Sequence, residues 1–300
     1  MNFGKIDPQL LHQVDLTLPN DHPVTTQLLN GTQVDEPHLY FGCSSWGLKD
    51  WVGTLYPKGL PSKDFLKYYS EFYQTVEMSS LFYGLPSSNQ LEKWYQAVGP
   101  DFRFCPKFSE VITHTKQLKG IEKELQLYLD NIAVLGEKLG PIFFMPHPKM
   151  GKESLTTILH FIEQLPPSLE VFTELRNSDW FTSPHHEVLF DTLENWNRGT
   201  VITDTAGKRE VIHMHLTTKE AFIRFVGNDL HPTDYQRIDE WVQRLKSWLD
   251  GGLEKCYFFI HQHEEKHAPI LLHYLIEELN THCNLSIPQK PFVFEGGLFG

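Results

Sequence analysis

Eight short apolar runs, each bounded by turn-forming residues, recur along this chain of 300 residues. Segments with a helical spacing of apolar residues separate most of them, and this alternation is typical of an α/β fold with a parallel sheet. Eight such units over residues 39–284 match the size of a (β/α)8 TIM barrel. We therefore predict one barrel domain, with strands at 39–44, 75–82, 102–107, 141–145, 170–174, 200–203, 221–226 and 256–260. A doubly wound open sheet is the competing α/β fold, and no GxGxxG motif or P-loop favours it.

Several predicted helices begin at recognisable residues. Ser87 and Gln90 form a possible capping box before an apolar stripe, and Thr233 and Gln236 repeat this pattern before a longer one. Pro269 suits the first turn of a last helix. The interval 205–219 has a weaker pattern, so we expect at most a short helix there.

Two further segments flank the predicted barrel. Residues 1–38 are polar, contain proline and show no clear period, so we interpret them as an N-terminal extension. Residues 285–300 are interpreted as a C-terminal tail whose last part lies over the barrel.

Composition narrows the classes of partner. The formal net charge of −12 argues against wrapping duplex DNA and against binding an anionic membrane surface. No apolar stretch approaches the roughly 20 residues of a membrane span, and the first residues lack the pattern of a secretory signal. The four cysteines lie far apart without a CxxC pair, which is typical of a reduced, cytoplasmic protein. The oligomeric state stays open, because the seven tryptophans suit either a dimer interface or the layer between helices and barrel.

Charged residues occur where a buried strand is expected to be apolar. An unpaired buried charge costs several kcal/mol, so such residues are paired or in use. Because active-site groups of barrels lie at the carboxyl ends of the strands, we predict a site at the mouth. The predicted catalytic residues are Glu77, Lys107, Glu174 and Asp204, and the predicted substrate-binding residues are Trp46, Ser79, Tyr83, His114, Arg176, Arg224 and Asn228.

Each of these residues also has a purely structural interpretation. Lys107 suits an anion or, if desolvated, amine chemistry, but it also suits an ion pair with Glu77. Glu174 and Arg176 are spaced for a local salt bridge as well as for a site. Asp204 follows a predicted strand, where aspartate also makes turns and helix caps.

Histidines raise the question of a metal. The pairs His213 with His215 and His261 with His263, followed by His267, would share a face on a strand and chelate there. Neither pair has a third ligand at a recognised spacing, and HExxH is absent. We therefore expect no metal and no other cofactor.

At these residues the chain resembles the YecE-like TIM-barrel proteins, the family called domain of unknown function 72. The resemblance covers roughly residues 40–270 and implies a barrel with polar residues gathered at one mouth, but no particular reaction. Two stretches depart from the pattern, at 226–228 and 261–265. The motifs that carry it, in order, are Gly42-Cys-Ser-Ser-Trp46 with Trp51, Gly53 and Tyr56-Pro57; Thr75 to Tyr83 with Pro86; Phe102 to Lys107 with His114; Glu174-Leu-Arg176 with Trp180; and Asp204 and Arg224.

The favoured hypothesis is a metal-independent enzyme, a hydrolase or an isomerase or lyase, acting on a small anionic, phosphorylated or sugar-like substrate. Arginines and Lys107 would hold the anion, carboxylates would supply acid–base chemistry, and Trp46 and Tyr83 would stack on the ligand. Glycoside hydrolysis by two carboxylates is a second enzyme hypothesis. The others are a nucleic-acid processing or binding barrel resembling metal-dependent DNA-repair endonucleases and a non-catalytic ligand sensor.

Overall fold

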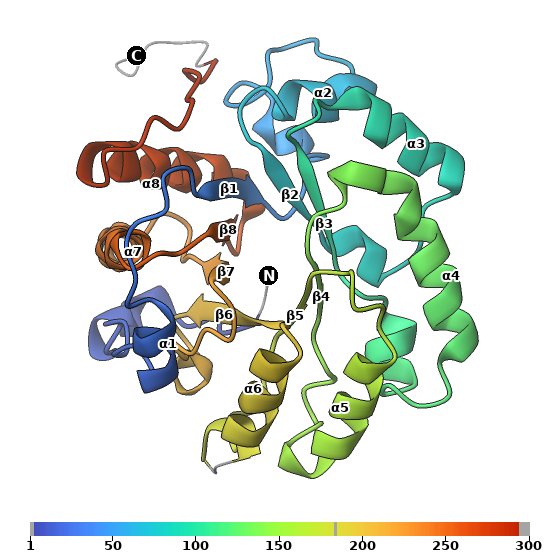
Figure 1. Cartoon of the computed structure of the whole chain (residues 1–300). Coiled ribbons are helices and arrows are strands. Elements are labelled where there is room, and N and C mark those ends of the chain that lie inside the picture. The colour runs from blue at the N-terminus through green and yellow to red at the C-terminus, as the bar shows by residue number, and fades with distance from the viewer. Residues whose placement is uncertain (1–2, 183–184, 294–300) are drawn as a thin grey trace.

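The computed structural model describes residues 3–182 and 185–293. Its parallel strands form a (β/α)8 barrel, and the helices lie around the outside (Figure 1). The predicted fold is therefore confirmed. The strands are β1 (His38–Cys43), β2 (Thr75–Met78), β3 (Arg103–Pro106), β4 (Ile142–Phe144), β5 (Val171–Thr173), β6 (Gly199–Thr205), β7 (Glu220–Val226) and β8 (Lys255–His261).

The α-helices follow the strands in the order expected of a barrel, apart from one interval. They are α1 (Pro23–Leu28), α2 (Phe65–Tyr69), α3 (Ser88–Ala97), α4 (Glu122–Ile132), α5 (Leu155–Glu163), α6 (His185–Asn195), α7 (Pro232–Asp250) and α8 (Ala268–His282). Between β6 and β7 there is only the 3-10 helix Arg209–Val211, as the weak pattern of this interval predicted.

The N-terminal segment compensates for that missing helix. Helix α1 packs on the stretch between β6 and β7: Thr25 donates to the carbonyl of Met214 at 2.8 Å and accepts from the amide of Leu216 at 2.8 Å. Further along the segment, Arg244 of α7 donates to the carbonyl of Pro19 at 2.8 Å. Residues 1–38 were predicted as an N-terminal extension because their sequence shows no clear period; the described part contains α1 and the 3-10 helix Pro8–Gln13.

The sheet runs in the order β3-β2-β1-β8-β7-β6-β5-β4. Its ends, β3 and β4, meet through isolated bridges, one of which pairs Lys107 with Phe143. The amide of Phe108 also donates to the carbonyl of Phe143 at 3.0 Å. The barrel is thus closed by a short seam, and Lys107 lies in it.

Alternation along the strands separates two apolar cores. Phe222 of β7 and Phe259 of β8 belong to a cluster inside the barrel, together with Phe143 and Phe172. Their strand neighbours, such as Ile223 and Phe225, join the larger core between sheet and helices.

Element boundaries confirm some expectations and correct others. Ser87 caps α3 by accepting from the amide of Gln90, and Pro269 lies in the first turn of α8, as predicted. The strand predicted at 75–82 ends at Met78, because the chain turns into the 3-10 helix Ser79–Phe82. Helix α7 begins at Pro232 and is capped by His231, so the capping box predicted at 233–236 is wrong.

The start of the predicted C-terminal tail lies against the barrel helices. Gln289 donates to the carbonyl of His273 in α8 at 2.7 Å, and the amide of Val293 donates to the carbonyl of Thr54. Residues 294–300 of this tail lie outside the described residues. Within the described parts of the chain, none of the helices is both long enough and apolar enough to span a bilayer.

Candidate active site

A layer of polar side chains lies directly above the aromatic core of the barrel. Strand alternation places it there, because residues two apart on a strand point to the same face. Phe222 of β7 and Phe259 of β8 belong to the core inside the barrel, and Arg224 and His261 lie two residues further along the same strands. Glu77 stands in the same relation to Thr75 on β2. The Arg224 guanidinium stands 5.1 Å from the ring centroid of Phe143 below it. Because the side chains beneath this layer are apolar, its charged groups must pair with one another.

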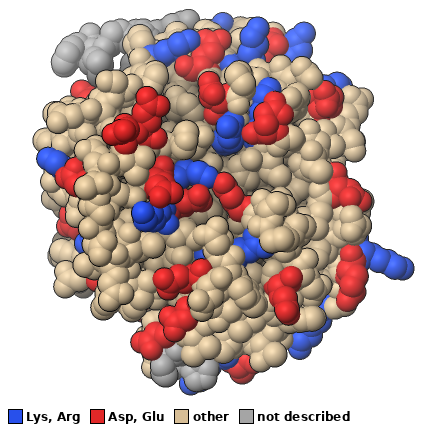
Figure 2. All heavy atoms as spheres, in the orientation of Figure 1, with Lys and Arg blue, Asp and Glu red and all other residues tan. Residues whose placement is uncertain are grey.

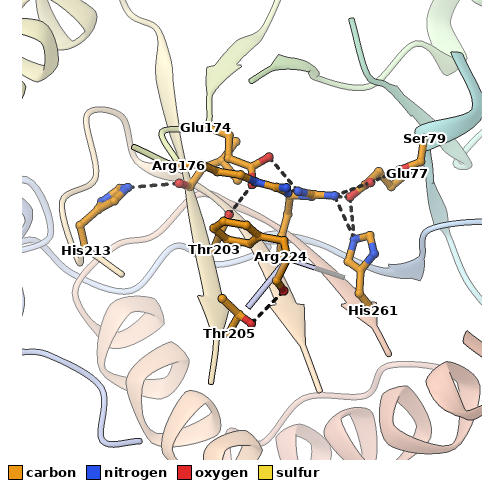
Figure 3. A network of polar contacts seen from close by, with 11 residues as sticks. Glu77, Ser79, Glu174, Arg176, Thr203, Thr205, His213, Arg224 and His261 are labelled. Atoms are coloured by element: carbon orange, nitrogen blue, oxygen red, sulfur yellow. Dashed lines mark hydrogen bonds and ion pairs between the residues drawn. The ribbon is translucent and has the colours of Figure 1, made fainter. Parts of the chain in front are cut away.

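Arg224 supplies that pairing by bridging two carboxylates (Figure 3). Its Nε and Nη2 donate to Glu77 at 2.8 and 2.9 Å, and its Nη1 donates to both oxygens of Glu174 at 2.9 and 2.7 Å. All three side chains are fully buried. Such charge-assisted fork geometry fixes both carboxylates in position.

Both carboxylates also interact with side chains other than Arg224. Glu174 accepts from Arg176 Nε at 2.7 Å and from Thr203 Oγ1 at 2.8 Å. Glu77 accepts from the Ser79 hydroxyl and contacts His261 Nε2 at 3.0 Å. Glu77 and Ser79 therefore meet as predicted, although Ser79 lies beyond the end of the strand.

These contacts keep both carboxylates ionised. Burial alone would raise their pKa values, but Arg224 and His261 hold the pKa of Glu77 well below its usual range, and Arg176 and Arg224 lower that of Glu174 to about 2. Neither group keeps a proton at neutral pH, so neither serves as a general acid. Glycoside hydrolysis needs one protonated carboxyl group and an open carboxylate, and this pairing argues against it.

The polar layer forms the floor of a cavity of about 620 Å³. Figure 2 shows basic and acidic side chains close together around the middle of the face seen in Figure 1. The cavity is lined by Phe3, Ser44, Ser79, Phe82, Tyr83, Lys107, Glu110, His114, Met145, Pro148, Arg176, Arg224, His261 and Glu265. Six predicted site residues thus line one cavity, with Glu77 and Glu174 paired to Arg224 in its floor.

Lys107 differs from the other charged groups of the floor. It is 8% exposed, and its Nζ lies 4.3 Å from the ring centroid of Phe82. Among the described residues no carboxylate forms an ion pair with it, so the predicted pairing with Glu77 is not observed. Burial, and then the nearby Arg224, lower the pKa of Lys107 to about 8.

His114 forms part of the cavity wall. Its Nδ1 lies 2.8 Å from Thr113 Oγ1, and its ring packs edge-on against Phe82. Burial, with His147 and Lys107 nearby, lowers its pKa to about 4. The imidazole is therefore uncharged at neutral pH and can accept a proton.

Asp204 lies outside this group. Strand β6 continues to Thr205, so Asp204 falls on the face opposite Thr203 and points toward the helices. It accepts from Trp241 Nε1 at 2.8 Å and pairs with Arg237 at 2.7 Å and with Arg209. The strand was predicted to end at residue 203, so Asp204 was expected at the mouth of the barrel. The strand in fact continues to Thr205, and Asp204 lies on its outer face.

Two predicted binding residues also lie away from the cavity lining. Trp46 packs edge-on against Trp94, with ring centroids 5.0 Å apart. Asn228 Nδ2 donates to Asp234 at 3.0 Å, behind the end of β7. Tyr83 does line the cavity and is 81% exposed at its rim.

The structure adds site residues that the sequence analysis missed. Phe3 comes from the N-terminal segment, and its ring lies 4.2 Å from the Arg176 guanidinium. Gly4 anchors it, because its carbonyl accepts from the amide of Gly207 at 2.9 Å. No signal in residues 1–38 pointed to the mouth. Phe82 is the last residue of the strand predicted at 75–82, and His261 directly follows the strand predicted at 256–260, so both positions did point to it.

The histidine pairs do not gather into a metal site. His213 and His215 lie before β7 rather than on a strand, and His215 stacks on His22 with centroids 3.8 Å apart. His213 Nε2 contacts the carbonyl of Val201 at 3.1 Å. Across the described residues no group of three or more histidine, cysteine or acidic side chains could hold a metal ion.

His215 predicts a pH-dependent stability. It is 2% exposed and its ring nitrogens have no hydrogen-bond partner among the described residues; burial, then His22, lower its pKa to about 3. Because the unfolded chain binds this proton near pH 6.5, the contribution of neutral His215 is complete above that pH and is lost as pH falls. Between pH 7.5 and pH 5, protonation of His215 in the unfolded chain should lower the free energy of unfolding of wild type by about 2 kcal/mol. His215→Phe lacks this group and should not show that loss.

Urea denaturation of both proteins at the two pH values measures this difference. His160→Phe is the matched control, because His160 lies exposed on α5 and should leave the pH dependence unchanged. Parallel stability curves for wild type and His215→Phe would contradict the assignment.

Comparisons with known proteins agree with the resemblance noted in the sequence. Residues 40–292 match the family model described as "Protein of unknown function DUF72". The chain is 25% identical over 266 residues to the UPF0759 protein YecE of Escherichia coli K12, covering 80% of this chain and 92% of that protein.

Two crystal structures of DUF72 family proteins share the fold. The one from Enterococcus faecalis V583 matches with a TM-score of 0.64 and 19% identity, over 84% of this chain and 100% of that one. The one from Thermotoga maritima MSB8 matches with a TM-score of 0.63 and 21% identity, over 81% and 99%. Since the family model spans the barrel and every cavity residue except Phe3, the chain belongs to the DUF72 family of proteins of unknown function.

Proposed function

We propose that this protein is a metal-independent enzyme that binds a small anionic substrate at the mouth of the barrel and uses Lys107 as its acid–base group. One observation carries the proposal: Lys107 is a nearly buried ammonium that faces the cavity without an ion pair among the described residues. Burying a charge without a partner is costly, so an anionic ligand is the natural partner.

The charges around Lys107 support a small anion. In the floor, the cations Arg224, Arg176 and Lys107 face the two carboxylates Glu77 and Glu174, which leaves one positive charge unmatched. The exposed Glu110 adds a negative charge at the rim, and Glu265, which also lines the cavity, contacts His261 Nδ1 at 3.5 Å. An acidic rim disfavours a long polyanion such as nucleic acid and leaves a compact anion, phosphorylated or carboxylated, as the better fit.

The proposed division of labour differs from the one expected from sequence. The carboxylates hold Arg224 and Arg176 in place, and their low pKa values make them weak bases. Lys107, with a pKa of about 8, exchanges protons far more readily near neutral pH, and the uncharged His114 lies in the cavity wall as a proton acceptor. The four free cysteines agree with a cytoplasmic location, which belongs to the same proposal.

Calorimetric titration with inorganic phosphate tests the proposal. We expect wild type to bind phosphate, with affinity falling above about pH 8 as Lys107 loses its charge, and Lys107→Met to bind at least about tenfold more weakly. Lys63→Met, which removes an exposed lysine elsewhere, is the matched control. Equal phosphate affinity in wild type and Lys107→Met, or no binding to either, would refute the proposal.

A further inference from the structure

The geometry around Lys107 points to a narrower class of substrate. Resting on the proposed function, we infer that the substrate is a small anionic carbonyl compound, an aldehyde or keto acid, which forms an imine with Nζ of Lys107. The inference starts from the place of Lys107 in the barrel. Its backbone is held in the seam by the bridge to Phe143, and Pro106 precedes it, so the base of the side chain is fixed.

The amine is available for attack on a carbonyl carbon. Its Nζ lies over Phe82 rather than against an oxygen of the neighbouring carboxylates, which are occupied by the arginines, Thr203, Ser79 and His261. With a pKa of about 8, roughly a tenth of Lys107 is neutral at pH 7, against less than a thousandth of an ordinary exposed lysine. Neutral amine is the nucleophilic form.

The cavity also supplies recognition of an anionic group. Arg176 lines it beside Lys107, and its guanidinium is held by Glu174 and by the ring of Phe3. A substrate whose carbonyl carbon reaches Nζ can direct a carboxylate or phosphate toward this arginine. Neutral carbonyl compounds lack that second contact.

The chemical step balances without another reactant. The lone pair of neutral Nζ attacks the carbonyl carbon, the C–N bond forms, and the carbonyl oxygen takes up a proton to give a carbinolamine. Loss of that hydroxyl as water, with the remaining nitrogen proton, leaves the C=N bond. The imine withdraws electrons from the adjacent carbon, and neutral His114 is placed in the cavity wall to accept a proton from it. This chemistry belongs to isomerases and lyases.

Reductive trapping tests the inference on the wild-type protein. The protein is incubated with glyceraldehyde 3-phosphate and sodium cyanoborohydride, and each lysine is followed by peptide mass spectrometry. We expect Lys107 to acquire the reduced adduct at least about tenfold faster than Lys63, because more of it is neutral. Glyceraldehyde, the uncharged counterpart, should show a much smaller preference for Lys107, and Arg176→Gln should reduce the advantage of the phosphorylated aldehyde.

The outcomes separate this inference from the proposed function. Equal labelling of Lys107 by both aldehydes overturns the anionic class of substrate, and labelling of Lys107 no faster than Lys63 overturns the imine assignment. If phosphate still binds through Lys107 in that case, the anion site stands and only the imine is lost. Lys107→Arg keeps the positive charge and should abolish the adduct at this position while retaining phosphate binding.

Discussion

Replacing Arg224 with methionine is expected to lower the free energy of unfolding by about 3–5 kcal/mol, because it leaves two fully buried carboxylates without their shared cation. Methionine fills a similar volume above Phe143, so loss of packing contributes little. Urea denaturation at neutral pH measures the loss. The deficit should shrink at lower pH, since without Arg224 burial raises the pKa values of Glu77 and Glu174 and both take up protons more easily.

A triple variant that also removes both partner carboxylates is the control for this prediction. Arg224→Met combined with Glu77→Gln and Glu174→Gln removes the buried cation together with both of its carboxylate partners and leaves Arg176 charged. Replacing such buried ion pairs with uncharged residues is often nearly neutral in stability. We expect the triple variant to be more stable than Arg224→Met alone. If it is equally unstable or worse, the cost comes from packing and hydrogen bonds rather than from uncompensated charge.

Replacing Asp204 with asparagine is expected to cost a similar amount, about 3–5 kcal/mol, while leaving the cavity intact. Asp204 is fully buried on the outer face of β6, and its carboxylate is the partner of Arg237, which is itself 1% exposed. Although burial alone would raise it, the pKa of Asp204 is lowered by Arg237 and Arg209. Its contribution is therefore present at neutral pH and is lost as pH falls through the lowered pKa.

Stability and site function should separate in this variant. Asp204→Asn is expected to lower the urea midpoint, whereas phosphate affinity below the unfolding transition stays at the wild-type value. Asp101→Asn, at an exposed position, is the matched control and should change neither. A folded Asp204→Asn protein that fails to bind phosphate would restore Asp204 to the site, as the sequence first suggested.

Together these variants distinguish a supporting layer from the reacting groups. Arg224 with its two carboxylates forms a platform at the bottom of the cavity. Lys107, with a pKa of about 8, and the uncharged His114 line the cavity with it. The side chains that hold the geometry are fully paired and buried. Lys107, which is proposed to exchange protons, can change its charge near neutral pH. This arrangement places the proposed chemistry on the lysine rather than on the carboxylates.

The local pattern of apolar and charged residues was sufficient to predict the fold and much of the candidate site. The apolar runs located all eight strands because a parallel strand covered on both faces must be apolar. A charge within such a run is rare enough to stand out, which is why Glu77, Lys107, Glu174, Arg176 and Arg224 were found together. Among the charged residues predicted at the mouth, Asp204 is the one that lies on the opposite face of its strand, because the end of that strand was misplaced.

Pairing across the barrel was decided by tertiary structure alone. Glu77 and Arg224 lie 147 residues apart in the chain, and no local rule states which cation meets which carboxylate. Nor does a local rule state that Lys107 meets none within residues 3–182 and 185–293. The N-terminal segment shows the same limit, because its polar, aperiodic sequence gave no sign that α1 occupies the interval without a helix or that Phe3 reaches Arg176. Closure of the strands into a ring brings these distant residues together, and the low dielectric inside that ring converts their arrangement into shifted pKa values.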